Sequence, residues 1–487
     1  MSVVLKLGQL RAAHWIGGEW VADGPWFDST NPGEGSLLGQ APAGGKIHAQ
    51  AAISAALHTF EATPWQYSPR VRAQVLLAMA ECLLADAPQL AMLLTLENGK
   101  LLRECAGEVE GAASELRYYA GMARSMAGRV LEPAPGVRSL ITHEAAGVVA
   151  IIVPWNAPLI LFARSLAPAL AAGCTVVVKA APQTALFMHR VAERLAETPG
   201  LPSGAINIVF ETGHEVAQEY VASPDVPVIS YTGSTAVGKS IMAAAAPQLK
   251  RLSLELGGKA PAVVCDDANL ALAVPEILSA GTILSGQQCT AVSRVLVQRK
   301  VYDAFRDQMI AAMRNFRIGP GHATDSQMGA VIDVANRDRI LALVDALGQQ
   351  HRLLVRGARV DGLPANGAFV SPSLLEVDDA HCDAVQSEHF APLLTLEVFD
   401  DDRSGVALAN ATRFGLGASV WTRDNARAQR IAQGIRCGTV WINAHNKLFA
   451  EAEVGGYKES GFGRLHGPGG LHDFQQTKHV YQEIGAL

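Results

Sequence analysis

The chain has 487 residues, of which 49% are hydrophobic and 18% charged, with a formal net charge of −6 and a pI of about 6.2. This length exceeds what one hydrophobic core accommodates, so we expect two or three domains. The acidic balance, the 6% aromatic content and the lack of a basic run argue against a nucleic-acid partner.

The sequence also lacks a clear targeting segment, a membrane span and a disulfide or metal-binding pattern. The first seven residues lack the apolar core of a signal peptide. The apolar stretches 145–153 and 166–178 are too short or too interrupted to span a bilayer. The seven cysteines form no CxxC pair and the histidines have no metal-ligand spacing. We therefore predict a cytoplasmic protein with reduced thiols, no membrane partner and no metal.

The first third of the chain has a helical pattern followed by an extended one. Apolar residues recur at spacings of three and four over 47–57 and 70–86, within a helical region that runs from 46 to 125. The segment 129–141 is punctuated by Pro and Gly and partly alternates, which predicts a hairpin or an extended arm.

From residue 147 onward, short β-rich runs alternate with helical segments. Such alternation predicts a parallel sheet covered on both faces, with nucleotides bound at the carboxyl ends of its strands. The predicted strands are 148–153, 175–178, 206–210 and 228–231, and the predicted helices are 159–172, 183–198, 213–222 and 236–246.

A second region of this kind begins near residue 261 and continues to about 440. Its predicted strands are 261–264, 295–298, 393–399 and 438–442, and its predicted helices are 270–280, 301–314 and 337–347. The C-terminal segment 478–484 is extended, and we expect it to pair with 129–141 or with another subunit.

Two residues in glycine-rich settings offer a nucleophile and a base. Cys289 lies in Gly-Gln-Gln-Cys-Thr-Ala, and Glu255 opens Glu-Leu-Gly-Gly-Lys. A thiolate attacks carbonyl carbon and holds an acyl group as a thioester. A carboxylate takes a proton from the water that releases the acyl group. Most buried cysteines are merely small core residues, so the pair needs further support.

Residues that follow three of the predicted strands are candidates for binding the reacting groups or a cofactor. Each of them also has a purely structural interpretation. Asn156, in Val153-Pro154-Trp155-Asn156, is a candidate oxyanion donor or a turn residue. Lys179 is a candidate ribose contact or a solvated lysine. Gly233 and Ser234 precede a helix whose first amides favour a pyrophosphate, although Ser234 also suits an ordinary helix cap.

Two further segments complete the set of motifs. Glu388 and Phe390 precede a predicted strand, and a lone acidic residue there is usually a loop charge. The segment 455–464 is rich in glycine and is either a mobile wall or an irregular connection. No GxSxG elbow is present.

The order of these motifs resembles that of the NAD(P)-dependent aldehyde dehydrogenase superfamily. The resemblance begins near Trp15 and covers nearly the whole chain. It implies an α/β fold with a Rossmann-like cofactor domain (1–125 and 145–255), an α/β catalytic domain (256–458) and a small β oligomerisation arm (126–144 and 470–487). It also implies a homodimer or a homotetramer.

The resemblance assigns a role to each motif. Cys289 is the implied nucleophile, Glu255 the general base, and Asn156 the oxyanion donor. The implied cofactor contacts are Val153, Pro154, Trp155, Lys179, Gly233, Ser234, Leu256, Glu388 and Phe390. The implied substrate contacts are Arg164, Ala157, Gln288 and Thr290.

The implied reaction is oxidation of an aldehyde to its acid. Cys289 forms a thiohemiacetal, hydride passes to the nicotinamide, and water activated by Glu255 hydrolyses the thioester. The presence of Glu255 argues against the branch of the family in which coenzyme A resolves the thioester. A thioester hydrolase without redox chemistry and a non-catalytic protein that kept the fold are the alternatives.

The chain departs from the family pattern in places that bear on cofactor and substrate. Many members carry Glu where this chain has Pro182, so the usual basis for preferring NAD over NADP is missing. Glu211 favours NAD, with NADP as the alternative. Leu465 stands where many members have Glu. Arg164 suits an aldehyde with an anionic or aromatic group, and a structural salt bridge is its other interpretation.

Overall fold

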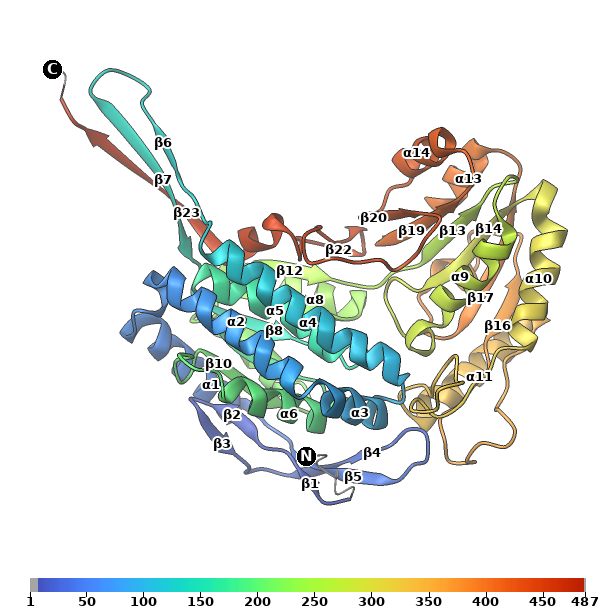
Figure 1. Ribbon diagram of the computed structural model, residues 1–487, viewed down its shortest axis with the longest axis horizontal. Helices are drawn as coiled ribbons and strands as arrows, with labels where there is room; N and C mark the ends of the chain where they lie inside the picture. The colour runs from blue at the N-terminus through green and yellow to red at the C-terminus, as the bar shows by residue number, and fades with distance from the viewer. Residues whose placement is uncertain (1–7, 486–487) are drawn as a thin grey trace.

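The computed structural model describes residues 8–485. The signal-peptide prediction and the outer ends of the predicted cofactor domain and arm (1–7 and 486–487) lie outside these residues. Two large sheets, each flanked by helices, form the body of the molecule, and a narrow β arm projects from it (Figure 1). This architecture confirms the predicted fold class.

The first sheet has eight strands in the order β22-β12-β11-β8-β9-β10-β2-β3. Its five central strands, β12 to β10, run parallel, whereas β22 and β2 pair antiparallel at either side. The bounds are β2 (His14–Ile16), β3 (Glu19–Val21), β8 (Val148–Ile152), β9 (Thr175–Ala180), β10 (Ile206–Phe210), β11 (Val228–Thr232), β12 (Arg251–Glu255) and β22 (Gly461–Phe462). All residues of β8, β10 and β11 are buried, as expected for parallel strands covered on both faces.

Helices cover both faces of this sheet. Side chains of α2 to α6 contribute to the core on one face, and side chains of α1, α7 and α8 to the core on the other. The bounds are α1 (Lys46–Ala62), α2 (Pro69–Ala85), α3 (Ala87–Asn98), α4 (Leu102–Ala123), α5 (Pro158–Ala172), α6 (Ala185–Ala196), α7 (Glu215–Ala222) and α8 (Thr235–Ala245). The predicted helices agree with these bounds to within a few residues, except that α1 extends past the predicted end at 57.

Helix α5 shows why such boundaries are readable from sequence. It begins at Pro158, which suits a first helical turn because that position needs no backbone N–H donor. It ends at Gly173, whose φ of 102° is a left-handed cap conformation.

Among residues 8–485, no single helix has the length and apolar character needed to cross a membrane. Only α2 and α3 taken together pass that test, and a bend of 68° separates them.

The second sheet has seven strands in the order β15-β16-β17-β14-β13-β19-β20, all parallel to their neighbours except β15. The strands are β13 (Ala260–Val264), β14 (Val292–Gln298), β15 (Arg352–Val355), β16 (Ser373–Glu376), β17 (Leu393–Phe399), β19 (Gly417–Trp421) and β20 (Thr439–Ile442). The helices are α9 (Leu270–Thr282), α10 (Tyr302–Arg314), α11 (Val334–Gly348), α12 (Asp383–Gln386), α13 (Asp402–Ala409) and α14 (Asn425–Gly434). The predicted strands and helices of this region are confirmed, although the strands β15, β16 and β19 and the helices α12, α13 and α14 were not predicted.

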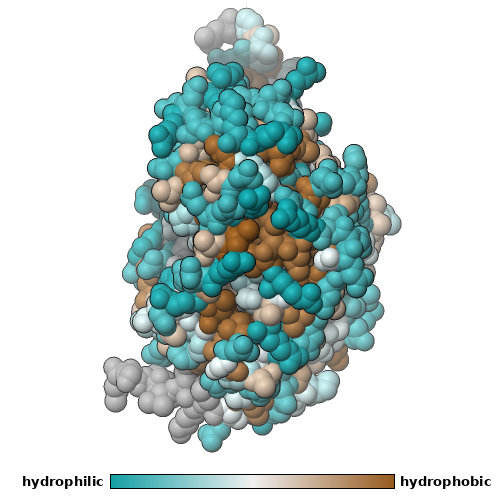
Figure 2. Space-filling view, turned by 90° about the vertical axis from the view of Figure 1, so that its right-hand side faces the viewer, coloured by the Kyte–Doolittle hydropathy of each residue, from teal (hydrophilic) through white to brown (hydrophobic). Residues whose placement is uncertain are grey.

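Helix α10, which packs on the second sheet, buries its apolar face against that sheet. In α10 the buried residues are Tyr302, Phe305, Met309 and Met313, a helical spacing that faces the sheet. The side of the molecule that carries α10 and α11 is largely hydrophilic, with apolar side chains gathered in smaller patches (Figure 2).

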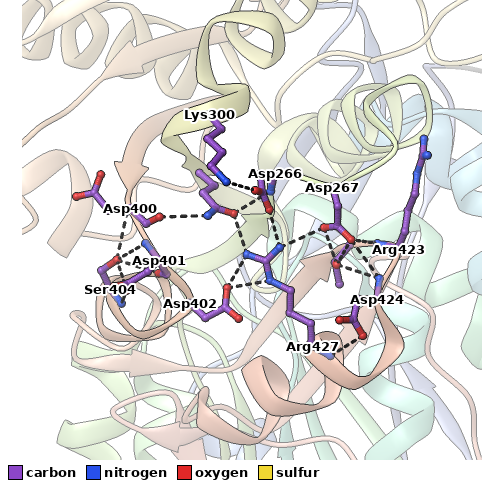
Figure 3. A network of polar contacts seen from close by, with 12 residues as sticks. Asp266, Asp267, Lys300, Asp400, Asp401, Asp402, Ser404, Arg423, Asp424 and Arg427 are labelled. Atoms are coloured by element: carbon purple, nitrogen blue, oxygen red, sulfur yellow. Dashed lines mark hydrogen bonds and ion pairs between the residues drawn. The ribbon is translucent and has the colours of Figure 1, made fainter.

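The carboxyl ends of β13, β14 and β17 are closed by a polar network around Arg427 of α14 (Figure 3). Its guanidinium contacts Asp266 at 2.7 Å, Asp402 at 2.6 Å and the Gln298 side chain at 2.8 Å. Hydrogen bonds from Arg427 and Lys300 lower the pKa of Asp266. Charged partners therefore occupy this end of the second sheet.

Smaller sheets complete the fold. One contains β1 (Leu10–Arg11), β5 (Leu37–Pro42) and β4 (Trp26–Thr30), and another pairs β18 (Phe414–Gly415) with β21 (Tyr457–Lys458). The arm contains β6 (Arg129–Leu131), β7 (Val137–Ala145) and β23 (Gln475–Glu483). Strand β23 pairs with β7 from Gln475↔Ala145 to Glu483↔Val137, so the C-terminal segment joins the arm of its own chain, the first of the two predicted alternatives.

Candidate active site

The two large sheets are joined directly by the segment 256–259. Glu255 is the last residue of β12, and β13 begins at Ala260. A Cβ at Gly257 would lie 2.2 Å from Oε2 of Glu388, and one at Gly258 would lie 2.3 Å from the carbonyl oxygen of Cys289. The two glycines thus allow Glu388 and the Cys289 backbone to pack against this connection.

A strained turn leads to Cys289. Leu284, Ser285 and Gly286 all have positive φ values, of 48°, 57° and 75°. Such a conformation costs roughly 1–2 kcal/mol for each non-glycine residue. The Ser285 hydroxyl offsets part of this cost by donating to the carbonyls of Gly329 and Ala330, at 3.1 and 3.0 Å.

The thiol of Cys289 belongs to a partly buried residue. Burial raises the pKa of Cys289 to about 11, and the Arg164 cation opposes that shift. The carboxylates of Glu388 and Glu255 add to the shift, because negative charges disfavour a thiolate. Cys289 is thus within electrostatic range of all three side chains.

Asn156 is held next to the Cys289 segment. It is 6% exposed and its Nδ2 donates to the carbonyl oxygen of Gln287 at 2.9 Å. A carboxamide has two N–H donors, so one remains for another acceptor. The Lys100 Nζ donates to the Asn156 carbonyl oxygen at 3.0 Å and fixes the backbone at this position.

Glu255 and Arg164 form a loose buried pair. Arg164 Nη2 lies 3.9 Å from Glu255 Oε2 and donates to the Thr232 hydroxyl at 3.1 Å. Burial raises the pKa of Glu255, and Arg164 opposes that shift. Glu255 Oε1 and Arg164 Nε are buried without a hydrogen bond to another protein atom. Such unpaired groups are costly in a core and are more typical of functional sites.

Lys179 lies beside the loop that contains Asn156. The Val153 N–H donates to the Lys179 carbonyl at 3.1 Å, just before Pro154 and Trp155. Lys179 is the second-last residue of β9, which ends at Ala180 paired with Phe210 of β10, so it lies at the carboxyl end of its strand as predicted. Burial lowers the pKa of Lys179, and Glu211 opposes that shift.

The acidic residue and the aromatic residue of the 388–390 motif both reach this region. Oε1 of Glu388 accepts from the Gly258 N–H at 3.0 Å, and burial raises the pKa of this carboxyl group. The ring of Phe390 meets that of Trp155 edge-on, with centroids 5.7 Å apart.

The start of α8 lies close to the same connection. Gly233 donates its N–H to the Glu255 carbonyl at 3.0 Å. The exposed Ser234 caps the helix by accepting from the Val237 N–H at 3.4 Å. This is the capping role that the sequence offered as the alternative to pyrophosphate binding. A Cβ at Gly238 would lie 2.5 Å from Leu256, so the helix packs tightly on that side chain.

The predicted substrate residues other than Arg164 make separate contacts. Ala157 caps α5 next to Asn156. Gln288 lines a small cavity together with Glu388 and Phe390. The Thr290 hydroxyl donates to Asn446 at 2.8 Å.

The glycine-rich segment 455–464 contributes β21 to the small sheet with β18 and β22 to the first large sheet. Within it, β22 pairs with β12, placing Gly461 opposite Glu255. The N–H of Leu256 also donates to the Ser460 carbonyl at 3.0 Å.

Sequence reasoning did not find the residues that hold these groups in place. Gln287 and Lys100 contact Asn156, and Glu108 pairs with Lys100. A Lys and a Glu eight positions apart in a helical region resemble an ordinary solvated face, and only their burial distinguishes them. Within residues 8–485, no group of three or more His, Cys, Asp or Glu side chains could hold a metal ion.

Comparison with known proteins identifies the class. The chain belongs to the aldehyde dehydrogenase family, whose model matches residues 20–480. This confirms the family resemblance found in the sequence.

Individual relatives match over almost their full length. The chain is 36% identical to betaine aldehyde dehydrogenase of Bacillus subtilis (strain 168), with 96% of each chain covered. It is 35% identical to mitochondrial succinate-semialdehyde dehydrogenase of Arabidopsis thaliana, covering 97% of this chain and 89% of the relative. The crystal structure of betaine aldehyde dehydrogenase from Staphylococcus aureus in complex with NAD+ has a TM-score of 0.95 at 35% identity, covering 99% of this chain and 97% of the other.

Proposed function

We propose that this protein oxidises an aldehyde to a carboxylic acid with NAD+, through a covalent intermediate on Cys289 that water hydrolyses. The observation that carries the proposal is the convergence of Asn156, Glu255 and Arg164 on the Cys289 segment. The Asn156 amide is bonded beside it, and both charged groups lie within electrostatic range of the thiol.

The residues around the connection 256–259 fit NAD+. The exposed amino end of α8 suits a pyrophosphate, and Lys179 and Glu388 offer a donor and an acceptor for ribose hydroxyls. Trp155 and Phe390 supply aromatic surface beside Glu388. When bound, NAD+ would supply the hydride acceptor that converts a thiohemiacetal to a thioester. A related crystal structure is in complex with NAD+, which supports NAD over NADP as the cofactor.

Each catalytic residue has a distinct task in this reaction. The Cys289 thiol loses its proton to solvent, its sulfur forms a bond to the aldehyde carbon as the carbonyl π bond opens, and the remaining Asn156 N–H stabilises the resulting oxyanion by about 3–4 kcal/mol. The free Oε1 of Glu255 accepts a proton from the water that attacks the thioester carbon. The C–S bond then breaks, releasing the acid and restoring the thiol.

Arg164 supports a substrate that carries a carboxylate, or an aromatic aldehyde with a phenolate. Among residues 8–485, its Nε makes no hydrogen bond to another protein atom and its one ion pair, with Glu255, is long. One of the relatives is named a succinate-semialdehyde dehydrogenase, whose named substrate carries a carboxylate. Betaine aldehyde, named in other relatives, is a quaternary ammonium compound that a buried arginine would repel.

The domain division follows from this assignment. The cofactor part would be residues 1–125 and 145–255, the catalytic part 256–458, and the arm 126–144 and 470–487. Strand β22 at Gly461–Phe462 adds an edge to the sheet of the cofactor part.

We assign the arm to oligomerisation, in a homodimer or a homotetramer. Eight of the nine residues of β23 are exposed, including the apolar Val480 and Tyr481. A sheet of three strands with no helix packed on it gains little stability alone, and its edges suit pairing with a second copy.

The test is a set of rate measurements with four aldehydes. Purified enzyme is mixed with NAD+ or NADP+ and succinate semialdehyde, 2-hydroxybenzaldehyde, betaine aldehyde or hexanal, and NADH or NADPH is followed by absorbance. We expect NAD+ to be reduced fastest with the first two aldehydes. Arg164→Met should lower kcat/KM for these by roughly ten- to a hundredfold relative to hexanal, since hydrogen bonds to charged groups contribute about 1.5–3 kcal/mol.

Hexanal is the internal control, because Arg164 also contacts Glu255 and its loss can affect every substrate. An equal decrease in kcat/KM with all four aldehydes would show that Arg164 does not recognise the substrate. No NADH or NADPH with any of the four aldehydes, together with hydrolysis of an added thioester, would favour the thioester hydrolase instead.

A further inference from the structure

Helix α4 carries one half-buried and two buried acidic side chains along one stripe that faces the candidate active site. Glu104, Glu108 and Glu115 are separated by four and seven residues, a spacing that places them on the same helix face. The helix lies against α5, whose amino end follows Asn156 (Figure 1). Glu108 and Glu115 are 6% and 2% exposed.

Glu104 holds the segment that leads to Cys289. Its Oε1 accepts from the Leu284 N–H at 3.0 Å, and its Oε2 accepts from the Leu101 N–H at 3.0 Å. Leu284 is the first residue of the left-handed run before Cys289. The carboxylate therefore ties the strained turn to the first turn of α4.

Glu108 holds the segment that contains Asn156. Its Oε1 accepts from the N–H groups of Leu159 and Ile160, at 2.7 and 3.3 Å, at the start of α5. It also pairs with Lys100, whose Nζ donates to the Asn156 carbonyl. A side-chain carboxylate at a helix amino end is favourable both as a cap and with the helix dipole.

Glu115 holds the segment that runs beside Glu255. It contacts Nδ1 of His466, a buried residue with a φ of 60°. One turn further along α4, the Tyr119 hydroxyl donates to the Gly467 carbonyl at 2.9 Å. A few residues earlier in the chain, β22 pairs with β12 and places Gly461 opposite Glu255.

We propose that α4 is a positioning helix, on which Glu104, Glu108 and Glu115 separately set the placement of Cys289, Asn156 and Glu255. The inference rests on the proposed function, since it assigns supporting residues to that reaction. None of the three carboxylates touches Cys289 or Glu255, so each acts through the segment it holds. Their effects should therefore separate by reaction step.

The experiment resolves the two halves of the reaction by rapid mixing. Enzyme preincubated with NAD+ is mixed with the best aldehyde, and the burst of NADH reports the steps up to the thioester. The later steady rate reports thioester hydrolysis when that step is slow. We expect Glu104→Gln to slow the burst on the order of tenfold. Glu115→Gln should retain the burst rate and slow the steady rate by a similar factor.

Glutamine suits both substitutions because it keeps the side-chain shape but loses one acceptor and the charge. Glu110→Gln is the matched control, since Glu110 is exposed on the opposite side of the same helix. Thermal unfolding of each variant with NAD+ establishes that it is folded. Should Glu115→Gln fail to fold, Tyr119→Phe releases the Gly467 carbonyl in the same segment without changing charge, and the same loss in the steady rate is expected.

Equal slowing of both phases in Glu104→Gln and Glu115→Gln would overturn the inference, because it would indicate a general structural loss. The inference would also be overturned if both variants had the same burst rate and steady rate as Glu110→Gln. A wild-type enzyme that forms no NADH with any aldehyde would overturn the proposed function, and this inference with it.

Discussion

At the scale of single residues, the environment of Cys289 is set by opposing effects of burial and charge. Burial raises the pKa of both Cys289 and Glu255, so each anion is less favoured here than it would be in water. Arg164 opposes both shifts. One buried cation thus stabilises whichever of the two anions the reaction requires.

The raised pKa of Cys289, about 11, gives a prediction for thiol reactivity. Only the thiolate reacts with iodoacetamide, and its fraction grows about tenfold per pH unit below the pKa. Alkylation of Cys289, followed by mass spectrometry of its peptide, should therefore accelerate steadily between about pH 7 and pH 10. A rate that levels off near neutral pH would show that the free enzyme already holds a thiolate.

The residues proposed to carry out the reaction were predictable from the sequence. The residues that hold them in place were not. Cys289, Glu255 and Asn156 stand in short motifs whose order is specific. Lys100 and Glu108 lie about fifty residues before Asn156, in a stretch that has only helical periodicity. Their importance comes from burial, which a single sequence does not display.

At the scale of elements, long periodic segments were predicted well and short ones were missed. Helix α5 and strands β10 and β17 lie within one residue of their predicted bounds. The strands β1 to β5, of two to six residues, were not predicted, because so few residues establish no period.

The turn before Cys289 was also beyond prediction. Nothing in the residue types of Leu284 and Ser285 indicates a positive φ, which is unusual for both. The turn exists because the Glu104 carboxylate and the Gly329 and Ala330 carbonyls bind it from other parts of the chain. Tertiary contacts determine the local conformation here.

At the scale of the whole molecule, the two sheets place the candidate active site at their junction. Glu255 ends β12 of the first sheet, and Cys289 precedes β14 of the second. The opposite end of β14 is occupied by the Arg427 network (Figure 3). The predicted alternation of strands and helices gave both sheets, but it did not indicate which strand ends would meet.

The arm gives a prediction at this scale. Val480→Asp combined with Tyr481→Lys places one charge on each of the two exposed faces of β23, and we expect the proposed oligomer to dissociate into smaller species. Size-exclusion chromatography with light scattering measures the mass, with Lys478→Gln on the same strand as the control. A wild-type monomer, or an unchanged oligomer in the double variant, would contradict the assignment of the arm.

A single-turnover measurement with Glu255→Gln tests most directly whether Cys289 carries an acyl group that Glu255-activated water removes. The variant is mixed with NAD+ and the best aldehyde, NADH is followed, and the intact protein and its Cys289 peptide are weighed by mass spectrometry. We expect about one NADH per subunit, followed by very slow turnover and an acyl adduct on Cys289. Full turnover without an adduct, or an adduct on another residue, would contradict the account.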